Sequence, residues 1–315
     1  MTGGTGFFGT WLLESLAEAN ARLDLGLRAT VLSRQPDAFR ASAPHISARS
    51  CFDWLAGDVR DFAFPSGAYS HVIHAGTAAS AALNAAHPEE MLDTILAGTR
   101  RVLEFARASG ARDVLFVSSG AVYGSQPPEL ERIPEIYVAA PSGTADAYAD
   151  GKRAAEMLCV DAARQGFLRP RIARCFAFVG PHLPLNAHFA VGNFLGDALA
   201  NRDIAVGGDG TPYRSYLHAA DLVAWLLTIL VRGSPLRAYN VGSDQAISIA
   251  ELAHCVARLP EPPVQVTIKR PAAGEPAHRY VPDIGRARRE LGLEVGIHLD
   301  AALRRTFEWL SRQSG

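Results

Sequence analysis

The sequence predicts an α/β protein: a doubly wound parallel sheet in the first part of the chain, followed by a smaller α/β region. Two observations carry this prediction. Over residues 1–178, short apolar, β-branched stretches alternate with longer helix-forming stretches, which is typical of parallel strands covered by helices on both faces. Over residues 179–315, prolines interrupt the pattern and indicate shorter, less regular elements. We therefore expect two regions with this boundary, partly interleaved.

Each element of the first region follows from such a stretch. The expected strands are residues 28–32, 71–75, 113–118 and 171–178, and the expected helices are residues 9–20, 88–109 and 148–165. A further apolar run at residues 222–231 is too short to cross a bilayer and is predicted to form a buried helix. A first strand normally precedes a glycine turn like the one at residues 3–9, and almost nothing precedes it here. Either that strand is a stub or the true start of the chain lies upstream.

Charge and cysteine content narrow the classes of function. The chain has 31 Lys and Arg against 32 Asp and Glu, a net charge of −1, so it lacks the electrostatic footprint of a nucleic-acid or anionic-membrane binder. Its four cysteines are scattered without a Cys-x-x-Cys pair, which argues against a zinc site or a disulfide framework. No metal site is predicted. No signal-peptide pattern opens the chain, and we expect a cytoplasmic protein.

The glycine turn predicts a bound dinucleotide. Glycine lets the backbone approach a pyrophosphate and adopt positive φ. The N–H groups at the start of the following helix then face the phosphates. The residues expected to contact the dinucleotide here are Gly3, Thr5, Gly6, Phe7, Phe8 and Gly9. The simpler alternative is a glycine-rich connection without a ligand.

Residues at the ends of the next strands extend this predicted cofactor site. NAD-dependent proteins usually carry Asp or Glu at the end of the second strand, to bind the ribose 2′-OH. Here Ser33 and Arg34 occupy that place and suit a 2′-phosphate, so NADP(H) is favoured over NAD(H) unless Arg34 is only a solvated loop charge. Asp58 is expected to accept from the adenine amino group, with Val59 against the ring. Ala75, which ends an expected strand, completes the set.

A second group of residues carries acid/base chemistry. Tyr148 and Lys152 are four residues apart, so a helix places them on one face. A phenol is a poor base at neutral pH, and a nearby ammonium lowers its pKa by stabilising the phenolate. Ser119 follows a predicted strand, where its hydroxyl can bind a substrate oxygen that becomes a carbonyl. Taken alone, the Tyr/Lys pair would be an ordinary surface pair.

These motifs in this order resemble the extended short-chain dehydrogenases/reductases, in the NAD-dependent epimerase/dehydratase group that acts on nucleotide sugars. The resemblance spans nearly the whole chain. It includes the glycine turn, Asp58–Val59, the run 117–124, Tyr148 with Lys152, residues 208–210 with Arg214, the run 239–243 and the C-terminal pattern at residues 282–293.

The resemblance implies a Rossmann fold with a substrate-binding C-terminal region. It implies that Tyr148 is the catalytic acid/base, that Lys152 holds the cofactor ribose and tunes the tyrosine, and that Ser119 orients the substrate. It implies a nucleotide-diphosphate sugar as substrate, contacted also by Arg214, by Asn193 in the segment 182–200 and, as a weaker match, by Arg270. Relatives commonly dimerise through the helices corresponding to residues 88–109 and 148–165, so we expect a homodimer.

Departures from the family pattern decide the expected subclass. The 4,6-dehydratases carry Asp-Glu, and the sugar-acid decarboxylases a nearby Glu, where this chain has Gly120 and Ala121. Neither residue transfers protons, which disfavours both chemistries. Ala177 replaces an Asn that contacts substrate in many relatives. The first hypothesis is therefore a nucleotide-sugar epimerase. The alternatives are an NADPH-dependent nucleotide-4-keto-sugar reductase, which Ser33 and Arg34 favour, and a dinucleotide-binding protein without catalysis.

Overall fold

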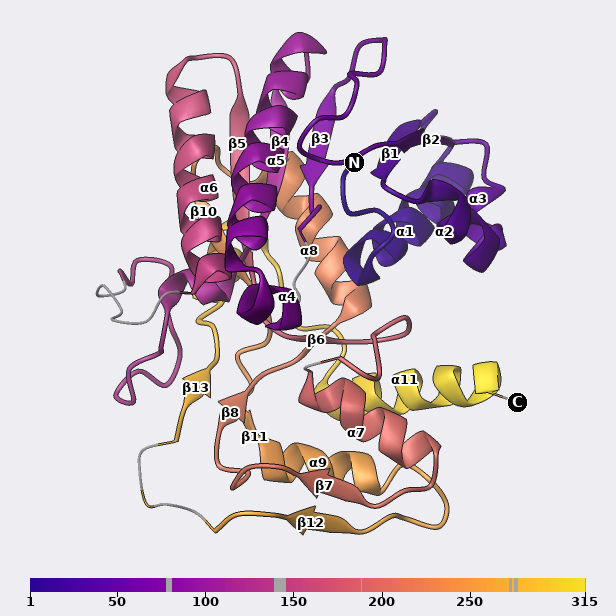
Figure 1. Cartoon of the computed structure of the whole chain (residues 1–315), viewed down its shortest axis with the longest axis vertical. Coiled ribbons are helices and arrows are strands. Elements are labelled where there is room, and N and C mark those ends of the chain that lie inside the picture. The colour runs from indigo at the N-terminus through magenta and orange to yellow at the C-terminus, as the bar shows by residue number, and fades with distance from the viewer. Residues whose placement is uncertain (78–80, 139–145, 188, 272–273, 275–276, 315) are drawn as a thin grey trace. The chain divides into compact units, whose positions relative to one another are not determined.

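The computed structural model describes residues 1–77, 81–138, 146–187, 189–271, 274 and 277–314. These residues fall into two compact units (Figure 1). Unit 1 comprises Met1–Val122, Pro141–Arg174 and Val223–Tyr239, and unit 2 comprises Tyr123–Ala140, Cys175–Leu222 and Asn240–Gly315. The chain therefore passes from one unit to the other several times.

Unit 1 contains the alternating strands and helices. Its strands are β1 (Ala29–Ser33), β2 (Phe52–Ala56), β3 (His71–His74), β4 (Asp113–Ser119), most of β5 (Arg169–Cys175) and the start of β10 (Ala238–Val241). Its helices are α1 (Phe7–Leu23), α2 (Pro36–Ser42), α3 (Pro44–Ser47), α4 (Ala81–Ala86), α5 (Pro88–Ala108), α6 (Ala147–Arg164) and most of α8 (Ala219–Arg232).

The strands of unit 1 form two groups. β1 pairs in parallel with β2, and β3 pairs in parallel with β4 in a sheet of order β10-β5-β4-β3. Thr2 lies between the groups and joins them by parallel bridges to Leu32 of β1 and His74 of β3. A single residue thus lies where the glycine turn predicts a first strand. The parallel sheet predicted from the sequence is confirmed, with Thr2 at its centre.

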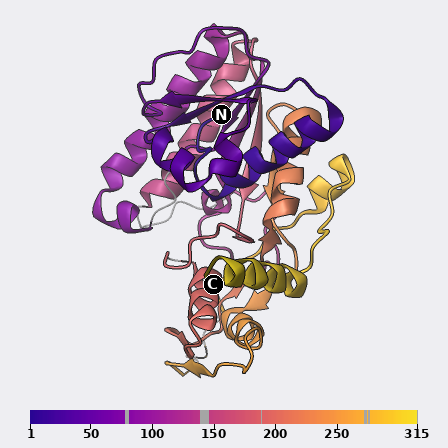
Figure 2. The ribbon, with the colours of Figure 1, turned by 90° about the vertical axis from the view of Figure 1, so that its right-hand side faces the viewer.

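Local sequence signals explain where the helices around this sheet begin. Pro88 occupies the first turn of α5 and Glu89 and Glu90 follow it, which suits the positive end of the helix dipole. The Asp146 side chain caps α6 by accepting hydrogen bonds from the N–H groups of Tyr148 and Ala149. Figure 2 shows α5 and α6 packed along each other. The cap therefore sets the start of the helix that carries Tyr148 and Lys152.

Unit 2 is built from shorter elements. Its elements are the end of the 3₁₀ turn Gly120–Tyr123, β6 (Phe178–Val179), α7 (Ala190–Leu199), β7 (Ile204–Val206), β8 (Tyr213–Arg214), β9 (Leu217–His218), β11 (Ile247–Ser248), α9 (Ile249–Ala257), β12 (Val266–Ile268), β13 (Arg279–Tyr280), α10 (Gly285–Leu291) and α11 (Leu299–Ser314). The strands form small sheets of order β11-β8-β13, β12-β7 and β6-β9. The buried Asn240 links distant segments of the unit, because it accepts from the Tyr123 hydroxyl and donates to the Ile133 and Asp283 carbonyl oxygens.

Two sequence predictions differ from the structure in detail. The strand expected over residues 171–178 is divided in the structure: β5 ends at Cys175, the Ala177 carbonyl oxygen accepts from the Leu217 N–H, and β6 begins at Phe178 and pairs with β9. The apolar run at residues 222–231 is helical as expected, but Val231 at its end is 66% exposed. Among the residues that the structure describes, no helix is long and apolar enough to cross a membrane.

Candidate functional site

The glycine turn has a shape that excludes side chains at two of its three spaced glycines. Gly3 has φ of +72°, and a Cβ there would lie 2.4 Å from the Ala75 carbonyl oxygen. A Cβ at Gly9 would lie 2.2 Å from the Gly3 carbonyl oxygen. At Gly6, by contrast, a Cβ would meet nothing closer than the Gly3 oxygen at 3.7 Å. The open face of the turn is therefore at Gly6, where a ligand can approach the backbone.

Helix α1 begins at this open face. Gly6 is its N-cap and brings no side-chain cap to the first turn. An anion is the natural partner of an N-terminus of this kind, because the helix dipole and the backbone N–H groups both favour negative charge. Thr5, Phe7 and Phe8 are half-buried around the same turn. The turn thus fits a dinucleotide pyrophosphate in both shape and charge.

The ends of β1 and β2 hold the other expected cofactor residues. Ser33 Oγ accepts from the Gln35 N–H at 3.2 Å, and Arg34 is exposed. Asp58 Oδ1 accepts from Arg60 Nε at 2.8 Å, and this hydrogen bond lowers the pKa of the Asp58 carboxyl, with the charge of Arg34 as a further, smaller cause. Sequence reasoning missed Arg60, although its place two residues after Asp58 was the available signal.

Val59 is directed toward helix α5. A Cβ added to Gly98 would lie 2.8 Å from Val59 Cγ1, so the two residues already pack closely. Ala75 lies on the other side of the glycine turn, where its N–H donates to the Thr2 carbonyl oxygen at 3.3 Å. The structure therefore brings Ala75 and Gly3 together, and it anchors Val59 against α5.

Lys152 is the most buried of the expected catalytic residues, with 3% exposure. Its Nζ donates to the Val117 carbonyl oxygen at 2.8 Å and to Thr77 Oγ1 at 3.1 Å. The same nitrogen lies 5.0 Å from the ring centre of Phe116 and 5.9 Å from that of Tyr148. Strand β4 therefore holds the ammonium beneath the tyrosine ring, as the i, i+4 spacing predicts. Thr77 was not predicted, because no local pattern marks it.

Ser119 ends strand β4 and begins the turn that follows. It is 7% exposed, and its Oγ accepts from the Ala121 N–H at 3.1 Å. This bond closes the start of the 3₁₀ turn Gly120–Tyr123. Because the Ser119 oxygen is the acceptor in it, the hydroxyl proton can still be donated to another acceptor. Ser119, Tyr148 and Lys152 all belong to unit 1, with the glycine turn.

A buried ionic cluster joins the catalytic helix to two strands. Glu156 Oε1 accepts from the Ser118 hydroxyl at 2.6 Å, and Arg174 binds both Glu156 oxygens, at 3.0 and 2.7 Å. Ser118 is the neighbour of Ser119, and Glu156 lies one helical turn after Lys152. The cluster therefore fixes β4 and β5 against α6. In the sequence, Glu156 stands four residues after Lys152, and this repeat of the i, i+4 spacing was the available signal for it.

Unit 2 contains a cavity of about 630 Å³ that includes one of the expected substrate residues. Its lining includes Asn193, Arg202, Gly208, Asp209, Pro212 and Ile249. Arg202 is paired with Asp197 at 2.7 Å, and Asp209 accepts from the Thr211 N–H and hydroxyl. Arg214 and Arg270 do not line this cavity. Arg214 donates to the Tyr213 carbonyl oxygen at 2.8 Å on β8, and Arg270 is exposed beyond β12.

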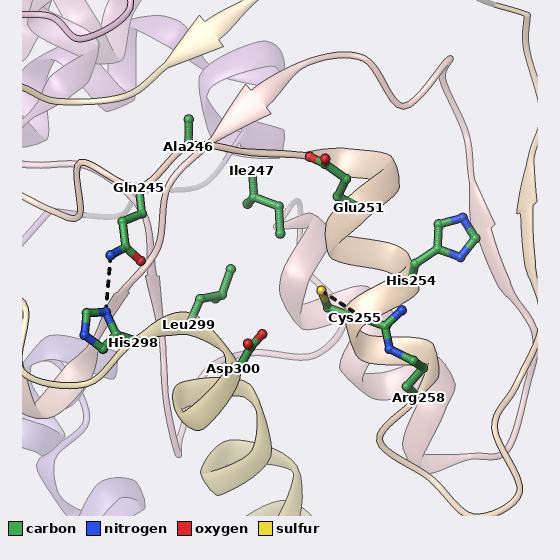
Figure 3. A pocket seen from close by; sticks show the side chains of 10 residues that line it. All are labelled: Gln245, Ala246, Ile247, Glu251, His254, Cys255, Arg258, His298, Leu299 and Asp300. Atoms are coloured by element: carbon green, nitrogen blue, oxygen red, sulfur yellow. Dashed lines mark hydrogen bonds between the residues drawn. The ribbon is translucent and has the colours of Figure 1, made fainter.

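A second cavity of unit 2, of about 620 Å³, lies between α9 and the start of α11 (Figure 3). Gln245 contacts His298 at 3.2 Å on one side, and Arg258 contacts Cys255 Sγ at 3.5 Å on the other. Burial raises the pKa of the Cys255 thiol, which keeps it protonated. None of the residues expected to bind substrate lines this cavity, so the site with Asn193 is the better candidate.

Known proteins resemble this chain in both sequence and fold. UDP-glucuronic acid decarboxylase 6 of Arabidopsis thaliana is 29% identical over 305 residues, which cover 96% of this chain and 85% of the relative. UDP-glucuronic acid decarboxylase 1 of Xenopus tropicalis is 28% identical over 315 residues, 99% of this chain and 72% of the relative.

Solved structures extend the likeness to the whole fold. UDP-glucose 4-epimerase from Thermotoga maritima matches with a TM-score of 0.84 and 21% identity, over 100% of this chain and 98% of that one. TunA, an NAD-dependent NDP-hexosamine 5,6-dehydratase, matches with a TM-score of 0.81 and 25% identity, over 100% and 97%. The model of the NAD dependent epimerase/dehydratase family matches residues 1–242. The resemblance expected from the motifs is confirmed, and the chain belongs to the NAD-dependent epimerase/dehydratase family.

Proposed function

We propose that this protein is a nucleotide-sugar epimerase that oxidises a sugar carbon transiently and reduces it again from the other face. The observation that carries the proposal is the combination of Tyr148, Lys152 and Ser119 in the unit that holds the glycine turn, with Gly120 and Ala121 directly after Ser119. Tyr148, Lys152 and Ser119 together can remove the proton from a sugar hydroxyl. Gly120 and Ala121 supply no carboxyl group for dehydration or for decarboxylation of a sugar acid.

The chain's own residues have distinct parts in this reaction. Tyr148 accepts the hydroxyl proton and later returns it. The Lys152 ammonium, held beneath the Tyr148 ring by Val117 and Thr77, stabilises the phenolate that forms. Ser119 donates its hydroxyl proton to the substrate oxygen and orients it. The residues of the glycine turn would hold the dinucleotide, whose nicotinamide would supply the acceptor and the donor of the hydride.

The dinucleotide is proposed to be NADP(H) in preference to NAD(H). Arg34 is exposed at the end of β1, where its guanidinium is available to a 2′-phosphate. Structural neighbours named as NAD complexes, such as the UDP-glucose 4-epimerase of Thermus thermophilus, favour the opposite choice. Calorimetric titration with both dinucleotides decides between them: NADP affinity that falls in R34E while NAD affinity does not would support the NADP preference, and equal affinities would exclude it.

The substrate is proposed to be a nucleotide-diphosphate sugar. The cavity of about 630 Å³ with Asn193 is large enough for part of such a molecule, and a relative crystallised with UDP-glucose shares the fold. The curated relatives described above are decarboxylases, yet Ala121 here replaces the glutamate expected for that chemistry. The homodimer also remains a proposal, and sedimentation that gives only monomers at micromolar concentration would exclude it.

The test is a product analysis with the purified chain. It is incubated with a panel of UDP-, CDP-, GDP- and dTDP-sugars, with UDP-glucuronic acid included, and the products are identified by NMR. An epimeric sugar without net change in the nicotinamide supports the proposal. Carbon dioxide release from UDP-glucuronic acid contradicts it, and binding without turnover of any sugar points to a non-catalytic protein.

A reductase is the second candidate, and Ser33 with Arg34 is the observation that favours it. An enzyme that uses NADPH once must exchange it, whereas an epimerase retains its dinucleotide. Denaturing the purified protein and identifying the released dinucleotide by mass spectrometry separates the two. Near-stoichiometric cofactor favours epimerisation. An empty protein that oxidises NADPH in the presence of a 4-keto sugar favours reduction.

A further inference from the structure

His74 is a buried imidazole at the end of β3, beside the glycine turn. It is 2% exposed, and its ring lies 5.6 Å from that of Phe116. Burial lowers its pKa to about 3, and the nearby charges of Lys152 and the Met1 ammonium act in the same direction. The ring is therefore neutral near neutral pH, so one ring nitrogen donates and the other accepts.

The hydrogen bonds around the ring decide which nitrogen carries the proton. The Thr99 hydroxyl donates to the Ile95 carbonyl oxygen at 2.7 Å, so its oxygen can only accept from His74 Nε2 at 3.1 Å. His74 Nε2 is therefore protonated and Nδ1 is an acceptor. Nδ1 then takes the hydroxyl proton of Thr2 at 2.8 Å. The Thr2 oxygen in turn accepts the Gly76 N–H at 2.9 Å.

This chain of hydrogen bonds fixes both sides of the glycine turn. Thr2 is joined to β3 by its backbone as well, since its N–H donates to Ile73 at 3.0 Å. A Cβ at Gly3 would strike Ala75, and a Cβ at Gly76 would lie 2.7 Å from Thr2 Oγ1. The turn and the end of β3 are thus in close contact, and the hydroxyl of Thr2 adds a side-chain link to the backbone hydrogen bonds between them.

We propose that His74, as its Nε2–H tautomer, is a positioning residue for the dinucleotide. It acts through Thr2: by accepting the hydroxyl proton of Thr2 it holds the start of the glycine turn against Gly76, and so fixes the turn whose open face at Gly6 is where the pyrophosphate is expected to bind. The inference rests on the proposed function, since it requires a dinucleotide at this turn. Its link to Thr99 serves to orient the ring and contributes to stability.

Two substitutions of His74 each keep one of the two hydrogen bonds of the ring and remove the other. In H74N the amide oxygen lies near the place of Nδ1 and keeps an acceptor for Thr2, while the bond to Thr99 is lost. In H74Q the longer amide reaches the place of Nε2, keeps the donor to Thr99 and leaves Thr2 without its acceptor. We expect the Kd for the dinucleotide to rise about tenfold in H74Q, equivalent to about 1.4 kcal/mol, and to stay near the wild-type value in H74N.

Matched variants at Thr2 and Thr99 test the same two hydrogen bonds from the side of the threonines. T2V removes the hydroxyl and should weaken dinucleotide binding as H74Q does. T2S keeps the hydroxyl and should bind the dinucleotide as the wild type does. T99V removes the bond that orients the ring together with the bond from the Thr99 hydroxyl to the Ile95 carbonyl oxygen, and it should lower stability with little effect on Kd. Binding is measured by calorimetry with NAD and NADP, and the free energy of unfolding by urea titration. A purely structural role predicts that Kd follows stability in all five variants, which would overturn the inference.

The tautomer is tested directly by long-range ¹⁵N–¹H NMR of the histidine ring. A protonated Nδ1 at His74 would overturn the inference, because Thr2 would lose its acceptor. Wild-type protein that binds NAD or NADP, with H74Q unchanged, overturns this inference alone. Wild-type protein that binds neither dinucleotide overturns the proposed function and this inference with it.

Discussion

Acidification should destabilise the folded protein through His74. The pKa of His74 is about 3 in the folded chain, against about 6.5 for an exposed histidine. Because the folded value is the lower one, the unfolded chain binds more protons in acid. The stability contributed by neutral His74 is complete above about pH 6.5 and is lost as the pH falls toward 3.

The magnitude follows from the width of that window. Each unit of pH between the two pKa values changes the free energy of unfolding by about 1.4 kcal/mol. Between about pH 6.5 and about pH 4 the loss is therefore about 3 kcal/mol, out of the 5–15 kcal/mol that is typical of folded domains. The nearby charges that act on His74 belong to Lys152 and to the Met1 ammonium, whose pKa burial lowers to about 6.

Urea unfolding of the wild type and H74N, followed by circular dichroism from neutral to acid pH, measures this contribution. Asparagine does not titrate, while Met1 and the carboxylates titrate in both proteins. The advantage of the wild type over H74N should shrink by about 3 kcal/mol across the window. A difference that stays constant with pH would contradict this, because it would mean that the pKa of His74 is the same in the folded and the unfolded chain.

Three further predictions concern the catalytic helix, its ionic cluster and the glycine turn. Y148F should lower kcat by about a hundredfold or more with an unchanged dinucleotide Kd, measured by steady-state kinetics and calorimetry; an active Y148F would remove Tyr148 as the acid/base. E156Q should lower the free energy of unfolding by about 3 kcal/mol, because it breaks a buried ion pair, whereas E18Q in the exposed Arg22 pair should change it by less than about 1 kcal/mol. Equal effects in urea titration would contradict the burial argument. G3A should be more destabilising than G26A, since both glycines have positive φ but only Gly3 has a backbone oxygen within 2.4 Å of the added Cβ. Similar melting temperatures for the two variants would count against the close packing of the turn.

Much of the fold was predictable because its signals are local. Helix starts follow from Pro88 and from Asp146, and the parallel strands follow from apolar runs that alternate with helices. The end of β5 was not predictable, because the backbone from Ala177 onward pairs with the segment at Leu217 and His218, far away in the sequence. No pattern within residues 171–178 records that change of partner.

The sequence by itself determined the glycine turn, the helix dipole beside it and the shared face of Tyr148 and Lys152, since each depends on residues within one turn of backbone. Only the tertiary structure decided what these groups contact. Lys152 meets Thr77, and Thr2 meets His74, because parallel strands bring their ends together across long crossover segments. Hydrogen-bond partners of that kind depend on strand order and register, and no spacing within the chain specifies them.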